Sequence, residues 1–236
     1  MNRFENQKDS IIQRSSVDIQ TYIAQVYGWM TVGLLLTAFV SWYAINNSSI
    51  IMYLATHAWV SIGLIIAEFA LVTGLSFLLP KLSGAMATAM FMLYSVLTGL
   101  TISLLLISYT GVSVATTFFI TAAMFCALSF YAYTTKRSLS GMGSFLFMAL
   151  IGMIISSLIN IWIQSSNLTL VITYAGILIF SGLTAYDTQK LKDMGNQIDN
   201  RNQESVRKYA IFGALTLYLD FINLFLMMLR IFGNRR

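Results

Sequence analysis

The sequence predicts an all-α polytopic membrane protein with seven transmembrane helices. Hydrophobic side chains make up 57% of the 236 residues and charged ones only 10%, which is about half the charged fraction of a typical soluble domain. Three long tracts contain no Asp, Glu, Lys or Arg: 19–67, 82–135 and 138–186. Because roughly 20 apolar residues cross the hydrocarbon core of a bilayer, each tract is long enough for two passes or most of them.

Seven hydrophobic segments, separated by polar stretches, are the predicted spans. In chain order they cover residues 25–45, 58–79, 84–107, 112–133, 143–163, 168–191 and 209–229. Seven such segments in a short chain leave no polar shell to cover them in water, and the alternating pattern of an outer-membrane barrel is absent. The predicted organisation is therefore a cytoplasmic tail at 1–24, a seven-helix transmembrane domain at 25–229 and a basic C-terminal tail at 230–236.

The distribution of Lys and Arg predicts the orientation of the helices. Basic residues gather in the N-terminal tail, in the loops at Lys81 and Lys136, and in the segment that precedes the last span, whereas the three intervening loops have none. The positive-inside rule then predicts a cytoplasmic N-terminus. A full last span would place the basic C-terminal tail outside, and a re-entrant last segment would keep it inside. These orienting charges explain the net charge of +5, so no nucleic-acid partner is expected.

Two acidic residues near the end of the chain are predicted to form a pair. Asp187 lies in the sixth span, before a helix end predicted at Gly195, and Asp220 lies near the middle of the seventh. One loop joins these spans, so they are antiparallel and can bring the two carboxylates within a few ångströms of each other. Since close carboxylates cannot both ionise cheaply, we expect the pair to share a proton and to act as a proton sensor or cation ligand. The alternative is that Asp187 contacts water and that Asp220 is hydrogen-bonded for packing alone.

Other polar residues inside the spans are candidates for accessory roles. Glu68, in the second span, either pairs with a cation, with Arg230 as the expected partner, or stays protonated and inert. Asn223 could ligate a cation through its carbonyl oxygen, although interhelical hydrogen bonding is commoner. His57 is the single histidine and has no cluster of ligands around it, which argues against a zinc site. No cofactor is expected.

Several segments resemble motifs of the transmembrane Bax-inhibitor-motif family. Residues 217–225, Leu-Tyr-Leu-Asp-Phe-Ile-Asn-Leu-Phe, followed by Leu229-Arg230, are similar to that family's last-helix motif. Residues 184–190, with the core Ala-Tyr-Asp-Thr-Gln, resemble its sixth-helix motif, and residues 22–36 and 133–137 resemble bacterial inner-membrane members. The resemblance extends over nearly the whole chain.

The resemblance implies a seven-helix fold with the last helix central, in a bacterial inner membrane. It also implies a di-aspartyl proton sensor, whose members would correspond to Asp187 and Asp220, and a pH-sensitive calcium leak in which these residues bind Ca²⁺ transiently. In some relatives a basic residue near the end of the second helix latches the sixth-helix aspartate. The nearest match here is Lys81, at a shifted position.

The leading functional prediction is a passive, proton-gated leak for Ca²⁺ or other cations, with the lipid bilayer, Ca²⁺ and protons as its partners. The alternative is a non-conducting regulator that binds another membrane protein, such as a quality-control protease. An intramembrane aspartyl protease is a third class. It ranks last because the flanks of Asp187 and Asp220 lack a glycine-rich neighbourhood, so we expect that the protein is not an enzyme.

Overall fold

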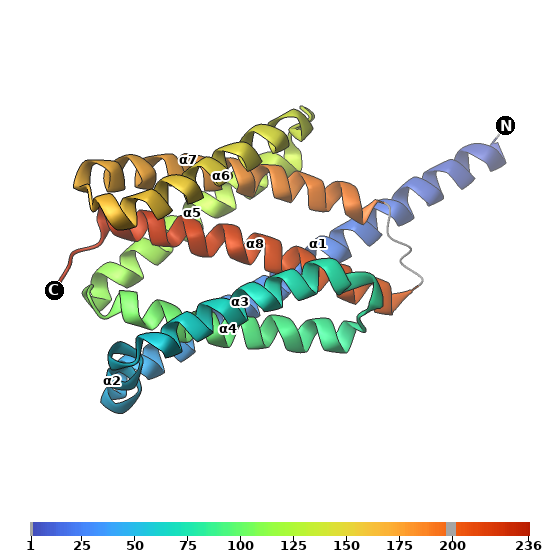
Figure 1. Ribbon diagram of the computed structural model, residues 1–236. Helices are drawn as coiled ribbons and strands as arrows, with labels where there is room; N and C mark the ends of the chain where they lie inside the picture. The colour runs from blue at the N-terminus through green and yellow to red at the C-terminus, as the bar shows by residue number, and fades with distance from the viewer. Residues whose placement is uncertain (1, 197–201) are drawn as a thin grey trace. The chain divides into compact units, whose positions relative to one another are not determined.

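The computed structural model describes the backbone of residues 2–196 and 202–236 and the side chains of residues 19–196 and 202–236. In these ranges the chain forms α-helices and a short 3₁₀ helix but no strand, as Figure 1 shows. The helices are α1 (Asn2–Asn46), α2 (Ser48–Thr56), α3 (Ala58–Leu78), η1 (Leu79–Lys81), α4 (Gly84–Leu106), α5 (Gly111–Thr134), α6 (Ser140–Ile163), α7 (Ser166–Gly195) and α8 (Gln203–Phe232). Seven of the described helices are long and apolar enough to cross a membrane, which confirms the predicted fold class.

All seven predicted spans coincide with helices of the structure. Helices α1, α7 and α8 extend beyond the predicted span ends, because polar residues from Asn2 onward, up to Gly195 and from Gln203 onward also adopt helical backbone. The cytoplasmic tail predicted at 1–24 falls largely on residues whose side chains lie outside the described part. The short helix α2 was not predicted. The side chain of Asn47 starts it by accepting hydrogen bonds from the backbone amides of Ser49 and Ile50.

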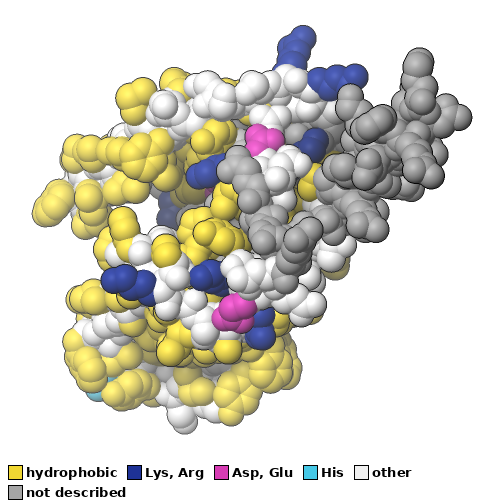
Figure 2. Space-filling model, turned by 90° about the vertical axis from the view of Figure 1, so that its right-hand side faces the viewer, with side chains coloured by type: hydrophobic (Ala, Val, Ile, Leu, Met, Phe, Trp, Pro, Cys, Tyr) yellow, Lys and Arg dark blue, Asp and Glu magenta, His cyan; other side chains and the backbone are white. Residues whose placement is uncertain are grey.

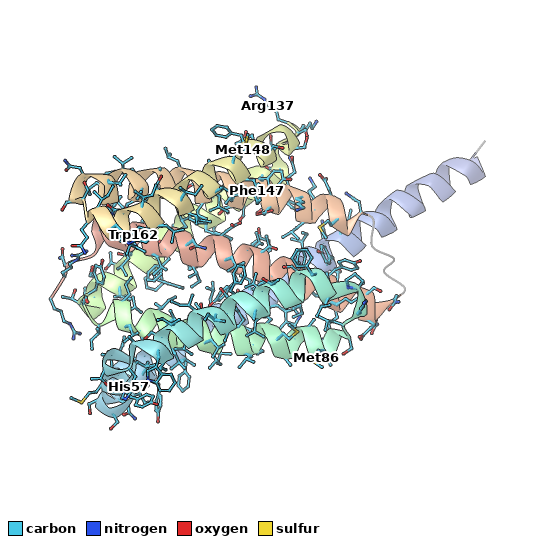
Figure 3. All side chains as sticks on the ribbon, in the orientation of Figure 1. His57, Met86, Arg137, Phe147, Met148 and Trp162 are labelled. Carbon is cyan, nitrogen blue, oxygen red and sulfur yellow. The ribbon has the colours of Figure 1, made fainter. Side chains whose placement is uncertain are left out.

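Apolar side chains cover the outward faces of the helices. On α6, Phe147, Met148 and Trp162 are 61%, 64% and 79% exposed, and Figure 3 places all three on this helix. Hydrophobic side chains also cover much of the surface in Figure 2, with a few charged ones among them. Because exposed apolar area costs about 25 cal/mol per Å² in water, a surface of this kind is suited to contact with lipid.

The helices form two compact units, and α4, α7 and α8 contribute residues to both. The first unit contains residues 1–103 and 191–215, and the second contains residues 104–190 and 216–236. In the first unit, the hydroxyls of Thr37 and Ser41 on α1 donate to the carbonyls of Ser95 and Gly99 on α4, at 2.9 and 2.8 Å. A Cβ at Gly99 would lie 2.8 Å from the Cβ of Val40. Glycine therefore lets α1 and α4 approach closely.

The core of the second unit is built around the C-terminal half of α8. The rings of Phe118 and Phe125 on α5 lie with their centroids 5.3 and 5.5 Å from that of Phe221, in the edge-to-face geometry that aromatic pairs prefer. Phe180 on α7 packs with Leu224 of α8. In its most apolar stretch α8 is 61% buried, more than any other described span. This burial confirms that the last helix is the central one.

The contacts at the two ends of α8 favour a full span over a re-entrant segment. In the first unit, the ammonium group of Lys208 donates to the carbonyl of Pro80, just before α4, at 3.2 Å. In the second unit, the backbone amide of Asn234 donates to the hydroxyl of Ser113, just after α4, at 2.8 Å. Together with the length of α8, a continuous helix of 30 residues that is long and apolar enough to cross a membrane, these contacts favour a complete span.

Candidate functional site

The carboxyl groups of Asp187 on α7 and Asp220 on α8 meet within the second unit. The two side chains lie within hydrogen-bonding reach of each other, and the charge of each acts on the other. Asp220 is only 5% exposed, and Asp187 is half-buried. Since a carboxylate can only accept, a hydrogen bond between two carboxyl groups requires a proton on one of them. The geometry therefore fits a pair that holds one proton between two acids.

One oxygen of this aspartate pair has no protein donor. Oδ2 of Asp220 is buried and has no hydrogen-bond partner among the described residues. A buried polar atom without a partner is costly, and an unpaired buried charge is costlier still. A proton or a cation placed at this atom would remove that cost. The pair can therefore respond chemically to either.

Buried hydroxyls and a tight aromatic contact hold α7 in place around Asp187. Thr188 is buried, and its hydroxyl donates to the hydroxyl of Ser129 on α5 at 3.3 Å. Tyr186 packs so closely on α6 that a Cβ added at Gly143 would lie 2.6 Å from its Cζ atom. The residues on both sides of Asp187 thus fix the rotation of α7, which decides where the carboxyl group points.

Gln189, two residues after Asp187, fastens α7 to the connection between α5 and α6. Its Oε1 atom accepts a hydrogen bond from the backbone amide of Leu139 at 2.6 Å, and its Nε2 atom donates to the carbonyl of Arg137 at 2.9 Å. One side chain therefore satisfies two backbone groups of this loop. The sequence analysis did not single out Gln189, because its partners lie 50 and 52 residues away.

The cation that the structure places beside Asp187 is Lys190, one helical turn further along α7. Its charge acts on the Asp187 carboxyl group, and its ammonium nitrogen lies 6.0 Å from the ring centroid of Tyr186. The spacing of three residues could have indicated this contact from the sequence. Lys81, the predicted latch, is exposed at the end of η1 in the first unit, and its role stays a prediction.

The accessory candidates have local partners. Glu68 in the first unit accepts a hydrogen bond of 2.6 Å from the hydroxyl of Thr101 on α4. The side-chain amide of Asn223 donates at 2.8 Å to the carbonyl of Leu219, so this bond stays within α8 instead of joining two helices. Arg230 is exposed in the last turn of α8. Its predicted pairing with Glu68 stays a prediction.

The donor set at the aspartate pair suits a loosely held cation. Ca²⁺ takes six to eight oxygen ligands, whereas two carboxylates supply at most four. Among the described residues, no group of three or more His, Cys, Asp or Glu side chains comes together. A Ca²⁺ ion at Asp187 and Asp220 would therefore keep several of its waters.

Comparisons with known proteins agree with the fold and the motifs. Residues 19–236 match the family model described as inhibitor of apoptosis-promoting Bax1. The chain is 61% identical to the inner membrane protein YbhL of Escherichia coli strain K12, over the full length of both chains. It is 42% identical to an uncharacterized protein of Borreliella burgdorferi, over 91% of this chain and 92% of that one. An uncharacterized membrane protein of Streptococcus pyogenes serotype M1 is 36% identical, over 95% of this chain and 97% of that one. The chain therefore belongs to the Bax inhibitor family of membrane proteins.

Proposed function

We propose that this membrane protein is a passive, proton-sensitive leak for Ca²⁺ or similar cations in a bacterial inner membrane, gated by the aspartate pair. The observation that carries the proposal is that the Asp187 and Asp220 carboxyl groups, on two apolar helices, lie close enough for the charge of each to act on the other. Acids in such positions are expensive, and they commonly mark ion or proton pathways. The proposal gives the pair a gating role and no catalytic one.

In this mechanism, the shared proton keeps the α7–α8 contact closed. When the proton leaves, two negative charges face each other in a water-poor site. Two unit charges 4 Å apart repel by about 4 kcal/mol at an effective dielectric constant of 20. The pair relieves this repulsion by separating or by taking up a cation, and either response opens a path for positive ions.

Lys190 has a defined part in this mechanism. Its ammonium group lies near Asp187, so it partly offsets the negative charge when the pair ionises. A passing Ca²⁺ ion competes with Lys190 for the same carboxylate. Because the pair supplies few ligand oxygens, the ion leaves as readily as it enters, as conduction requires.

Calcium flux across a pH series tests the proposal. The full-length chain is reconstituted into vesicles that contain a calcium indicator, and flux is recorded for the wild type, Asp187→Asn, Asp220→Asn and a control, Asp193→Asn. Asp193 is an exposed acid on the same helix α7. We expect a pH-dependent flux in the wild type and the control, and a flattened pH response in both pair variants.

A flux with the same pH profile in all four proteins would refute gating by the aspartate pair. No flux at any pH would refute the leak itself and would favour the non-conducting regulator. Deletion of the tail before Tyr22 then tests that alternative, because loss of a co-purifying membrane protein is expected if the tail binds it.

A further inference from the structure

A cavity of about 680 Å³ lies in the first unit, between residues 21–29 of α1 and the first turns of α8. Its lining includes Tyr22, Gln25 and Trp29 of α1 and Gln203, Glu204 and Arg207 of α8. This volume is within the range of small-molecule sites. The residues of the cavity are separate from the aspartate pair.

Arg207 is the one basic residue among the described lining residues of this cavity. Its Nε atom donates to the hydroxyl of Thr88 at 3.2 Å, and its guanidinium carbon lies 5.8 Å from the ring centroid of Trp29. Its two terminal amino groups have no hydrogen-bond partner among the described residues. The carboxylate of Glu204, by contrast, accepts a hydrogen bond from the backbone amide of Gly84, so the N-terminus of α4 offsets its negative charge.

The remaining walls combine amide donors with aromatic surface. The side chains of Gln25 and Gln203 are exposed at the cavity and form no hydrogen bond with any other described residue. Tyr22 is nearly fully buried, and its hydroxyl donates to the carbonyl of Tyr209 at 3.4 Å. A guanidinium group with neighbouring amide donors matches the oxygens of a phosphate group, which it can bind with two parallel hydrogen bonds.

The cavity also lies at the first turns of the α8 span, where a membrane helix meets the lipid headgroups. The α8 span begins at Gln203, and the α8 lining residues up to Arg207 lie within about 6 Å of that end at the helical rise. Tyrosine, tryptophan and arginine are the side chains that favour the boundary between lipid and water. The ligand can therefore arrive from the bilayer as well as from solution.

We propose that this cavity binds the phosphate ester of an anionic phospholipid headgroup, held by Arg207, Gln25 and Gln203, with Trp29 against the apolar part of the lipid. The charges favour a phosphodiester, because its single negative charge matches the one uncompensated cation. Free phosphate shares the chemistry but is partly dianionic near neutral pH, and one arginine does not balance the second charge.

Native mass spectrometry of the full-length protein tests this site with phosphatidylglycerol and phosphatidylcholine as probes. We expect tighter binding of phosphatidylglycerol, because the choline group offsets the phosphate charge of the other lipid. Arg207→Gln and Gln25→Glu should each weaken phosphatidylglycerol binding by about tenfold or more, since each removes or repels a charge-assisted contact. Arg137→Gln is the matched control, an exposed arginine in the loop before α6, and should bind as the wild type does.

Gln25→Glu keeps the proposal testable if Arg207→Gln destabilises the fold by removing the hydrogen bond to Thr88. Its lipid-free melting temperature should equal that of the wild type while its lipid affinity falls. Equal affinity of the wild type and both cavity variants, or equal binding of the two lipids, would overturn the proposal. Displacement of phosphatidylglycerol by millimolar inorganic phosphate would show that the cavity prefers free phosphate to a lipid headgroup and would overturn the proposal. Retention of the lipid supports it.

Discussion

At the scale of single residues, the charge of Lys190 bears directly on Asp187. The positive charge favours the ionised carboxylate, so its removal makes the pair hold its proton until a higher pH. We therefore expect Lys190→Gln to move the midpoint of the pH response of the flux upward, by less than about one pH unit because Lys190 is exposed and water screens it. Lys136→Gln, an exposed lysine in the α5–α6 loop, should leave the midpoint in place. A midpoint that falls or does not move in Lys190→Gln would contradict the electrostatic role.

Gly143 provides a second test at this scale, through the position of Tyr186 next to Asp187. An added Cβ would lie 2.6 to 2.7 Å from three atoms of Tyr186, whereas a Cβ at Gly141 on the same helix would meet nothing within 4 Å. Overpacking of this kind typically costs about 1 to 3 kcal/mol. We expect Gly143→Ala to melt at a lower temperature in detergent than Gly141→Ala. Equal melting temperatures would show that the Tyr186 ring moves freely.

At the scale of elements, the two bonds of Gln189 join α7 to the α5–α6 loop. Gln189→Ala leaves the backbone amide of Leu139, at the start of α6, without its acceptor, and an unsatisfied buried group costs about 1 to 3 kcal/mol. The melting temperature of Gln189→Ala should therefore be lower than that of the wild type, and the backbone amide of Leu139 should exchange its hydrogen faster. Gln189→Glu keeps the acceptor and loses only the donor, so its melting temperature should lie between those of Gln189→Ala and the wild type. If all three proteins melted alike, the loop would not depend on this side chain.

Hydrophobic length explains which elements the sequence could predict. Seven segments are long enough to cross a bilayer, and each became a helix, because a backbone in lipid must satisfy its hydrogen bonds internally. Helix α2 has only 9 residues, which is too short to carry that signal. Its start depends on one side chain, Asn47, whose capping role is set by local backbone geometry. The polar extensions of α7 and α8 escaped prediction because they are helical without being apolar.

At the scale of the whole molecule, the aspartate pair could be predicted but its surroundings could not. Antiparallel neighbouring helices and similar depths were enough to bring Asp187 and Asp220 together. The contacts of Gln189 and of Arg207 depend on how each helix is rotated and on residues 52 and 119 positions away. A pattern of hydrophobicity does not determine such rotations, and it did not predict the two compact units. The cavity beside Arg207 was missed for the same reason.

The pH titration of the buried carboxyl groups tests the pairing most directly. Infrared difference spectroscopy on the full-length protein in lipid follows the protonated carboxyl band in the wild type, Asp187→Asn and Asp220→Asn. If the two acids share one proton, neutralising either residue must change the pH at which the other titrates. A band that titrates at the same pH in the wild type and in a single variant would mean that the two carboxyl groups ionise independently, and it would contradict the shared proton.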